Sequence, residues 1–530
     1  MVNPQTLRQK GIAVLLLAVL LLLLLVKIKT PFNFYDEGLV LNNAVRVSHG
    51  DIPYRNFWGI YPPGQFYILS ALFKITGENL LPARLYDTLV RFALVIAVFL
   101  IVRKIASRGY ALWTAGIVAL MLATIGFYTY PVFPAVALSL WAVWCWLNYV
   151  YTCQNRWLLA AGALLGVTSL IRWDVFLYAA ISILITAYLF LRLSAAPGPS
   201  WLKQLFAPLP TLIWLLAPML LISLGGYGLL ALYSGWDNLF HQAFYFPAVK
   251  LREVRHLAYP SLLPADFPPS DDWRRFYLPI FIFVLAGITY LIILWRKRGR
   301  VDPGFYGVLT LILCGAFLFN QGLSRYDYIH VLPSSIPAFM VCMIFSYRAL
   351  PQMKNRWMKY ALYLLMGVST LVYFNPAVKE LRLTFRHFAP WGCYSGLERA
   401  SCAALDANQE QAVRFIQSVT RPNERIFVGN TRHDRIFVSD VGFYYLAARP
   451  AATRYQELHP GEANTLPVQT EIVGELEAHQ VQWIVLVGIW DSTEPNDSAK
   501  SSGVHLLDDY LAAHYQTVTN FGQYQIARRR

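Results

Sequence analysis

Long stretches without charge are the feature that most constrains what this chain can fold into. Residues 11–26, 111–126, 206–230 and 277–295 contain no Asp, Glu, Lys or Arg. A helix of roughly 20 apolar residues crosses the hydrocarbon core of a bilayer, which is about 30 Å thick. A backbone in lipid must also satisfy its own hydrogen bonds, and a helix does so within one segment. These stretches therefore predict transmembrane helices.

The same reasoning along the chain predicts a mainly α polytopic membrane protein with about eleven transmembrane helices. The expected spans are residues 11–27, 86–104, 110–128, 132–151, 158–172, 174–192, 206–233, 277–295, 303–322, 331–348 and 358–374. The composition agrees, since 56% of the residues are hydrophobic and only 14% are charged. The net charge of +15 does not indicate nucleic acid. Lys and Arg instead gather in short clusters at the ends of the apolar runs, where they set topology.

Those basic clusters predict the orientation of the protein. Arg103, Lys104, Arg192, Arg296 and Arg348 all fall at span ends on one side, which the positive-inside rule makes cytoplasmic. The N-terminus then lies in the cytoplasm, and an odd number of spans places the C-terminus outside. We expect the plasma membrane of a bacterium, which is its inner membrane, to be the location.

With this orientation, the unusual polar segments all emerge on the outer side. They are the first outer loop, residues 28–85, and three shorter segments at residues 172–174, 234–276 and 324–330. Polar segments distributed at random would occur on both sides of the membrane. Their gathering on one side predicts a functional site assembled from outer loops.

The composition changes after the last span, which divides the chain into a transmembrane domain, residues 1–375, and an extracytoplasmic α/β domain, residues 376–530. Short β-like runs begin at Arg425, Arg435 and Trp483. Residues 471–480 and 506–515 have the pattern of amphipathic helices, and residues 491–503 that of a mobile loop. Outside the cell, Cys393 and Cys402 would form a disulfide.

Asp36 stands at the start of a predicted helix in the first outer loop. Apolar residues recur at helical spacing over residues 37–49, opposite Asn42, Asn43 and Arg46, and Gly50 ends the pattern. This predicts a helix lying at the membrane interface. Asp36 could simply cap it. A capping carboxylate would keep a low pKa and remain ionised, and it could still accept a proton from a substrate hydroxyl.

Several motifs of this loop resemble the first outer loop of C-type-fold (GT-C) membrane glycosyltransferases. The motifs are residues 35–38, Tyr-Asp-Glu-Gly; 50–57, Gly-Asp-Ile-Pro-Tyr-Arg-Asn-Phe; 61–64, Tyr-Pro-Pro-Gly; and 83–85, Ala-Arg-Leu. The pattern is similar to family 39-like enzymes, which resemble protein O-mannosyltransferases and lipid A aminoarabinose transferases. The resemblance implies inverting transfer of a sugar from a polyprenyl- or dolichyl-phosphate donor. It also implies that Asp36 is the base with Glu37 beside it, and that Arg55 and Tyr61 contact substrate.

Cations on the outer side are candidates for holding the donor phosphate, because arginine forks match phosphate oxygens. The candidates are Arg172, Lys250, Arg252, Arg255, Arg325 and His330, with Asp174 and Asp327 as acidic neighbours in the site. Each has a plain alternative. Arg172 and Asp174 could be a structural ion pair, residues 250–256 a solvated charge run, and Arg325 and Asp327 a structural pair at a helix mouth.

Other functions fit parts of the sequence. A secondary transporter would also have many helices, but its ionisable residues would be expected near mid-span and its halves repeated. An O-antigen ligase or polymerase would transfer a whole glycan instead of one sugar. His330 and Asp327 could ligate a divalent metal, but two ligands without a third make weak support for one, so we expect no metal and no certain cofactor. The expected partners are membrane lipid, a polyprenyl-phosphate-linked sugar, and an acceptor lipid, glycan or protein.

Overall fold

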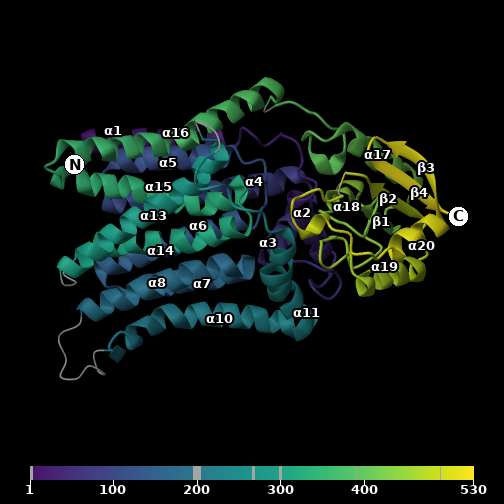
Figure 1. Ribbon diagram of the computed structural model, residues 1–530, viewed down its shortest axis with the longest axis horizontal. Coiled ribbons are helices and arrows are strands. Elements are labelled where there is room, and N and C mark those ends of the chain that lie inside the picture. Colours follow the sequence, from purple (N-terminus) through teal and green to yellow (C-terminus); the bar gives the residue numbers. More distant parts are fainter. Residues whose placement is uncertain (1–3, 195–204, 265–268, 298–300, 390, 490) are drawn as a thin grey trace.

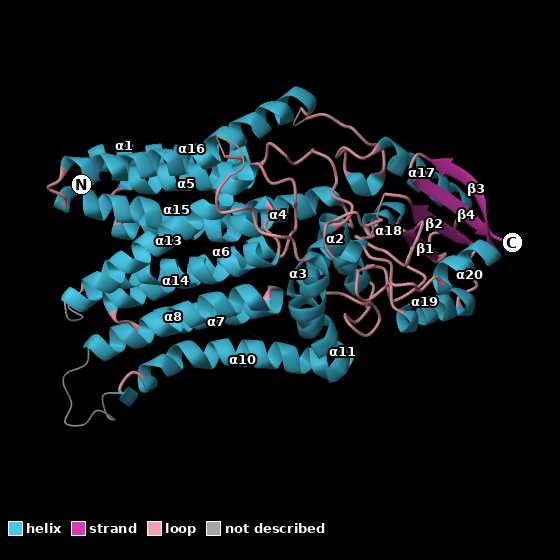
Figure 2. Cartoon of the chain, in the orientation of Figure 1, coloured by secondary structure: helices cyan, strands magenta, loops and turns pink. Residues whose placement is uncertain are grey.

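The computed structural model describes residues 4–194, 205–264, 269–297, 301–389, 391–489 and 491–530. Roughly parallel helices form one end of an elongated molecule, and a smaller α/β domain forms the other end (Figure 1). The four strands all lie in that smaller domain (Figure 2). The predicted fold class, a mainly helical membrane protein with a C-terminal α/β domain, is confirmed.

Each predicted span has a helix at its position. Eight helices among the described residues are long and apolar enough to cross a membrane. They are α4 (Leu80–Ile105), α6 (Val132–Thr152), α8 (Trp173–Ser194), α10 (Leu209–Ser234), α13 (Asp271–Arg296), α14 (Pro303–Ser324), α15 (Tyr328–Ala349) and α16 (Arg356–His387). Three shorter or partly apolar helices join them: α1 (Pro4–Leu24), α5 (Arg108–Ala123) and α7 (Asn155–Ile171).

Side-chain caps mark where several of these helices begin. Ser270 Oγ accepts a hydrogen bond from Trp273 N at 3.2 Å at the start of α13, and Asp302 Oδ2 accepts one from Gly304 N at 3.1 Å at the start of α14. Asp327 does the same for His330 N, at 3.2 Å, at the start of α15. A cap satisfies backbone N–H groups that have no partner in the first turn. The span ends are therefore fixed by local sequence as well as by the bilayer.

The first outer loop contains two helices, α2 (Asp36–Ser48) and α3 (Gly64–Thr76). The helix predicted over residues 37–49 is present as α2, and its position at a membrane interface stays a prediction. The C-terminal domain covers its polar face. Asn42 Nδ2 donates to Gln456 Oε1 at 2.8 Å, and Asn43 Nδ2 donates to Glu457 Oε1 at 2.6 Å. Nearly all of α2 is buried as a result.

A connection of three short elements follows α10, at the end of the bundle that faces the C-terminal domain (Figure 1). It consists of α11 (Trp236–Phe240), the π-helical segment η1 (His241–Lys250) and α12 (Leu251–Arg255). π-Helical turns occur often at functional sites. Gln242 of this connection donates to the backbone oxygen of Tyr54 at 3.0 Å, which ties the connection to the first outer loop.

The C-terminal domain packs helices on a four-stranded sheet of order β1-β2-β4-β3. Strand β1 (Ile426–Asn430) is parallel to β2 (Trp483–Val487), and Ile426 pairs with Trp483. Strands β3 (Tyr515–Phe521) and β4 (Tyr524–Arg529) form an antiparallel hairpin, and β4 pairs with β2. The helices are α17 (Ala407–Val419), α18 (Gly442–Ala447), α19 (Leu466–Ala478) and α20 (Leu506–His514), with 3₁₀ turns η2 (Leu350–Gln352) before α16 and η3 (Glu398–Ala400) and η4 (Asp497–Ala499) in this domain.

Several details of this domain differ from the prediction. The run from Arg435 forms no strand, because its side chains are held by neighbours outside the sheet: Arg435 pairs with Asp491 at 2.5 Å. The same pair holds one end of the 491–503 segment, whose mobility stays a prediction. Helix α16 continues past residue 375 to His387, where Glu380 pairs with Lys27 at 2.6 Å. The predicted disulfide between Cys393 and Cys402, by contrast, is confirmed.

A fully buried ion pair fastens the first outer loop to the bundle. Arg84 of α4 binds Glu37 of α2 through two hydrogen bonds of 2.8 Å. The same guanidinium donates to the backbone oxygens of Ile28 and Thr30 at 2.9 and 2.8 Å. Both side chains have 0% exposure, so neither charge has water as an alternative partner.

We expect Glu37→Gln to destabilise the protein strongly, because it leaves the Arg84 charge buried and unpaired. Removing one partner of a buried pair costs about 3–5 kcal/mol. The measurement is the melting temperature of detergent-solubilised protein. Glu253→Gln is the control, since it breaks the exposed pair with Lys250 and should change stability by less than about 1 kcal/mol. Equal melting temperatures for the two variants would contradict the structural role of Glu37.

Candidate active site

A cavity of about 480 Å³ lies where the helix ends meet the C-terminal domain. Four outer segments that are far apart in the sequence contribute to its walls, and so does the C-terminal domain. The charged lining residues are Asp36, Arg172, Asp174, Arg252, Arg255, Arg325, Asp327 and His330. The gathering of polar segments predicted from the sequence is therefore present in the structure.

Asp36 lies in the cavity wall at the first turn of α2, and it does not cap this helix. The start of α2 is held instead by Asn33, whose Oδ1 accepts hydrogen bonds from Tyr35 N at 3.1 Å and Asp36 N at 2.8 Å. The Asp36 carboxylate accepts no hydrogen bond from any residue that the structure describes. Burial raises the pKa of Asp36 to about 6, although the positive charges of His330 and Arg255 oppose this rise. The expectation of a low pKa was therefore wrong.

Glu37, the next residue, points away from the cavity. Its carboxylate is held by Arg84, as described above, and by Asn33 N at 3.2 Å. Glu37 does not line the cavity. Adjacent positions on a helix face directions about 100° apart, so the two carboxylates of this acidic pair have separate environments. Glu37 is placed to fix the backbone that presents Asp36.

Arg172 and Asp174 form an ion pair on the cavity wall between α7 and α8. Arg172 Nε donates to Asp174 Oδ1 at 2.9 Å, and Gln321 Nε2 donates to Asp174 Oδ2 at 3.0 Å. The Arg172 guanidinium also lies 5.2 Å from the ring centroid of Tyr61. Its Nη1 is buried and has no hydrogen-bond partner among the described residues. The ion pair therefore holds the two helix ends together, while Nη1 of Arg172 can still donate a hydrogen bond to a ligand.

Arg325, Asp327 and His330 form a second cluster between α14 and α15. Arg325 Nε donates to Asp327 Oδ2 at 2.8 Å, and Asp327 Oδ1 lies 2.6 Å from His330 Nδ1. Burial opposes ionisation of Asp327, but His330 and Arg325 outweigh it and hold the pKa of Asp327 below its usual range. Arg325 also binds both oxygens of Glu494 from the C-terminal domain. Two carboxylates therefore neutralise the guanidinium of Arg325.

Arg252 and Arg255 enter the cavity from the connection after α10. Arg255 lies 4.5 Å above the ring of Phe437, and it forms neither an ion pair nor a hydrogen bond with any residue that the structure describes. Its buried Nε has no partner either. Among the described residues, Arg252 donates only to Asn320 Oδ1, at 3.4 Å. These two arginines carry the positive charge in the cavity that no carboxylate neutralises.

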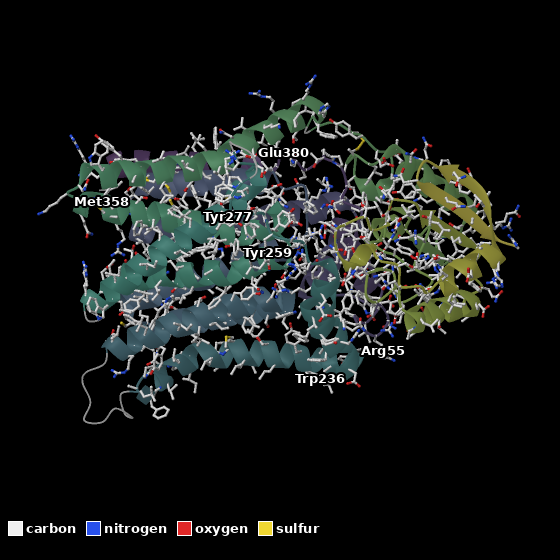
Figure 3. All side chains as sticks on the ribbon, viewed as in Figure 1. Arg55, Trp236, Tyr259, Tyr277, Met358 and Glu380 are labelled. Carbon is white, nitrogen blue, oxygen red and sulfur yellow. A yellow bond between two sulfur atoms is a disulfide. The ribbon has the colours of Figure 1, made fainter. Side chains whose placement is uncertain are left out.

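Two predicted contacts lie outside the cavity. Lys250 is exposed and pairs with Glu253 at 3.4 Å. Arg55 is exposed in the loop after α2, and Figure 3 labels it on the side of the bundle that faces the C-terminal domain. The sequence pattern placed both residues in outer segments, which was insufficient to show which side chains turn inward.

Several lining residues were missed by sequence reasoning. Tyr130 belongs to the short turn before α6, Asn320 and Gln321 to the last turn of α14, and Phe437 to the C-terminal domain. Tyr130 and Gln321 resemble the ordinary aromatic and polar residues of a membrane boundary. Phe437 was hidden in a run predicted to be a strand. Only the packing of the two domains reveals these contributions.

The described residues contain one group with ligand spacing suited to a metal, and it lies away from the cavity. It comprises Asp434, His505 and Asp508 in the C-terminal domain. Arg432 binds both oxygens of Asp434, each at 2.7 Å, and so competes with any cation there. Asp327 and His330 form a hydrogen bond with each other. No such group of three metal-binding side chains includes them within the described cavity wall.

The comparisons with known proteins agree with this architecture. Residues 61–223 match the family described as dolichyl-phosphate-mannose-protein mannosyltransferase. ArnT from Cupriavidus metallidurans bound to undecaprenyl phosphate has a similar structure, with a TM-score of 0.55, 14% identity and 98% of each chain covered. Its apo state gives a TM-score of 0.53 at 13% identity, again over 98% of each chain. The oligosaccharyltransferase of Archaeoglobus fulgidus, in complex with Zn and sulfate, gives 0.50 at 11% identity and covers 96% of this chain and 72% of that one.

No curated protein matches the chain. The fold is that of the GT-C membrane glycosyltransferases, and the chain resembles the protein mannosyltransferases and ArnT within that class. These findings support a glycosyltransferase that uses a lipid-linked sugar.

Proposed function

We propose that this protein is an inverting glycosyltransferase that moves a sugar from a polyprenyl-phosphate donor to a hydroxyl acceptor on the outer side of the membrane. One observation carries the proposal. The cavity at the end of the helical bundle joins the carboxylate of Asp36, which accepts no hydrogen bond from the described residues, to two arginines without carboxylate partners there. Transfer from a glycosyl phosphate requires a base for the incoming hydroxyl and cations for the departing phosphate.

Asp36 serves as the base. The acceptor hydroxyl gives its proton to Asp36 as its oxygen forms a bond to the anomeric carbon of the sugar. The bond between this carbon and the phosphate oxygen breaks, and its electron pair leaves with polyprenyl phosphate. Attack on the face opposite the phosphate inverts the anomeric configuration. A pKa of about 6 makes Asp36 a stronger base than an ordinary aspartate, while it remains mostly ionised at neutral pH.

Arg255 and Arg252 hold the phosphate, and Arg325 lies beside them, over the same Phe437 ring as Arg255. A phosphate that binds Arg255 gains a charge-assisted hydrogen bond without displacing an ion pair. Binding to Arg325 would instead compete with Glu494 and Asp327. The hydrogen bond between Asp327 and His330 Nδ1 orients the imidazole, so its other nitrogen can meet the phosphate or the sugar.

The donor is assigned as a polyprenyl phosphate because the ArnT structure was determined with undecaprenyl phosphate bound and shares this fold. The acceptor hydroxyl belongs to a lipid, a glycan or a protein. Outward orientation is supported by the basic span ends opposite the cavity, and by the Cys393–Cys402 disulfide, since such bonds persist in oxidising compartments. We place the protein in the bacterial inner membrane with the cavity and C-terminal domain outside.

We expect Asp36→Asn to lower kcat by about 100-fold or more, because it removes the general base. In the wild type, kcat/KM should rise with pH and level off above about pH 6, where Asp36 becomes ionised. This limb should be absent from the residual activity of the variant. Donor-dependent transfer at several pH values measures both effects. Asp237→Asn, on the exposed surface of α11, is the control and should behave as the wild type. Near-normal turnover of a folded Asp36→Asn variant would show that Asp36 is not the general base.

Arg255→Gln should raise the donor KM roughly tenfold, because it removes a charge-assisted bond of about 1.5–3 kcal/mol. The acceptor KM should remain unchanged. Lys250→Gln is a matched control on the same connection, since Lys250 lies outside the cavity. If the two variants have the same donor KM, Arg255 does not bind the phosphate.

The topology predicts which thiols meet an impermeant maleimide. Lys500→Cys introduces a thiol at a site that is 77% exposed on the C-terminal domain. Cys153 is a natural, exposed thiol at the opposite end of α6 from the cavity. In intact spheroplasts we expect labelling at position 500 and none at Cys153, while lysed membranes should label both. Labelling of Cys153 alone would show the inverted orientation.

A further inference from the structure

A second polar cavity, of about 460 Å³, lies between the C-terminal half of α2 and the outer domain. No described residue lines both this cavity and the candidate active site. Its lining contains five arginines, which are Arg46, Arg399, Arg425, Arg449 and Arg454, and two histidines, which are His49 and His479. Its carboxylates are Asp51 and Glu475. The described lining therefore has an excess of positive charge.

Three of the arginines form a rigid wall. Arg46 donates to Asp51 Oδ2 at 2.6 Å and to the Asn56 oxygen at 2.9 Å. Arg449 is buried and binds Thr420 Oγ1 at 2.8 Å together with four backbone oxygens. Arg399 binds the Tyr445 oxygen at 2.9 Å and pairs with Glu78. These guanidiniums are held in place by neighbours, so they contribute a fixed positive potential.

The other two arginines retain unused donors. Arg425 makes one hydrogen bond, to the Ala451 oxygen at 3.0 Å, and no ion pair with any described residue. Arg454 makes a long contact with Glu471, at 3.5 Å, and lies 5.3 Å from the ring centroid of Tyr455, while its Nε is buried without a hydrogen-bond partner among the described residues. Thr453 is 4% exposed, and its hydroxyl is also buried without a partner there. Buried polar groups are normally satisfied, so the two buried groups, Arg454 Nε and Thr453 Oγ1, indicate a missing ligand that the exposed Arg425 on the same lining can also reach.

We propose that this cavity binds a sugar that carries a phosphate or carboxylate group. Arginine forks match these planar or tetrahedral oxyanions through paired hydrogen bonds. The volume is that of a small-molecule site and exceeds what a bare ion requires. Asn56, Asn423 and Thr453 in the lining suit sugar hydroxyls. The exposed side chains of Asn423, Arg425 and His479 mark an opening to solvent.

This site goes beyond the proposed function and does not depend on it. The two cavities are joined by α2, which places Asp36 at its start in one and Arg46 near its end in the other. Ten residues of helix separate them by about 15 Å. A bound anionic sugar would thus sit outside the reaction centre on the same buried helix.

The test measures binding of glucose 1-phosphate by calorimetry to the full, detergent-solubilised protein. The Arg255→Gln variant is the background, because phosphate binding in the candidate active site would otherwise contribute. We expect binding in this background, weakened about tenfold or more by adding Arg425→Gln or Arg454→Gln. Arg414→Gln is the matched control in the same domain, since Arg414 pairs with Glu410 outside the cavity, and it should leave binding unchanged.

Inorganic phosphate and neutral glucose separate the two parts of the ligand. We expect inorganic phosphate to bind more weakly than glucose 1-phosphate, and glucose not to bind measurably. Loss of all binding in the Arg255→Gln background would overturn the proposal, and so would binding that ignores Arg425→Gln and Arg454→Gln. Inorganic phosphate equal to glucose 1-phosphate would overturn the sugar assignment. None of these results bears on transfer activity, which the Asp36→Asn and Arg255→Gln kinetics test separately.

Discussion

The ion pair between Glu37 and Arg84 is the interaction on which the geometry of the candidate active site depends. Charges with no exposure to water are expensive to bury, and they persist where the geometry is good and further hydrogen bonds complete their coordination. Arg84 meets both conditions, since it binds Glu37 through two bonds and also holds the backbone oxygens of Ile28 and Thr30. The first turn of α2 is thereby fixed to α4, and with it the direction of Asp36.

Two adjacent carboxylates therefore have different tasks. Glu37 is fully buried and paired, and its charge is compensated by Arg84. Asp36 is presented to a cavity where desolvation outweighs the positive charges of His330 and Arg255, so its pKa rises to about 6. A carboxylate that an ion pair fixes, next to one that can still exchange a proton, suits acid–base chemistry. The sequence motif contains both, but only their environments distinguish them.

The sequence predicted the architecture well because the bilayer imposes strong and simple constraints. Apolar length located the spans, and polar segments on one side located the cavity. The directions of individual side chains were harder to predict. Arg55 follows α2 and Arg255 ends α12, yet Arg55 is exposed and Arg255 lies over Phe437 in the cavity. That difference arises from packing against the C-terminal domain, whose contacts span hundreds of residues and leave no local pattern. The β3–β4 hairpin was also missed, because no regular alternation of apolar and polar residues marks β3, in which Val518 stands between two threonines.

The C-terminal domain thus does more than cover the bundle. Phe437 supports Arg255, Glu494 neutralises Arg325, and Gln456 and Glu457 take the polar face of α2. Without this domain, Arg325 would lose a carboxylate and α2 would expose a helix that now lies buried. The cavity therefore contains two kinds of arginine. The domain neutralises Arg325 through Glu494, whereas it positions Arg255 through Phe437 without supplying a carboxylate. An anionic donor should prefer the second kind, because binding there breaks no existing pair. The domain therefore determines which cavity arginines lack a carboxylate partner and are available to the proposed phosphate.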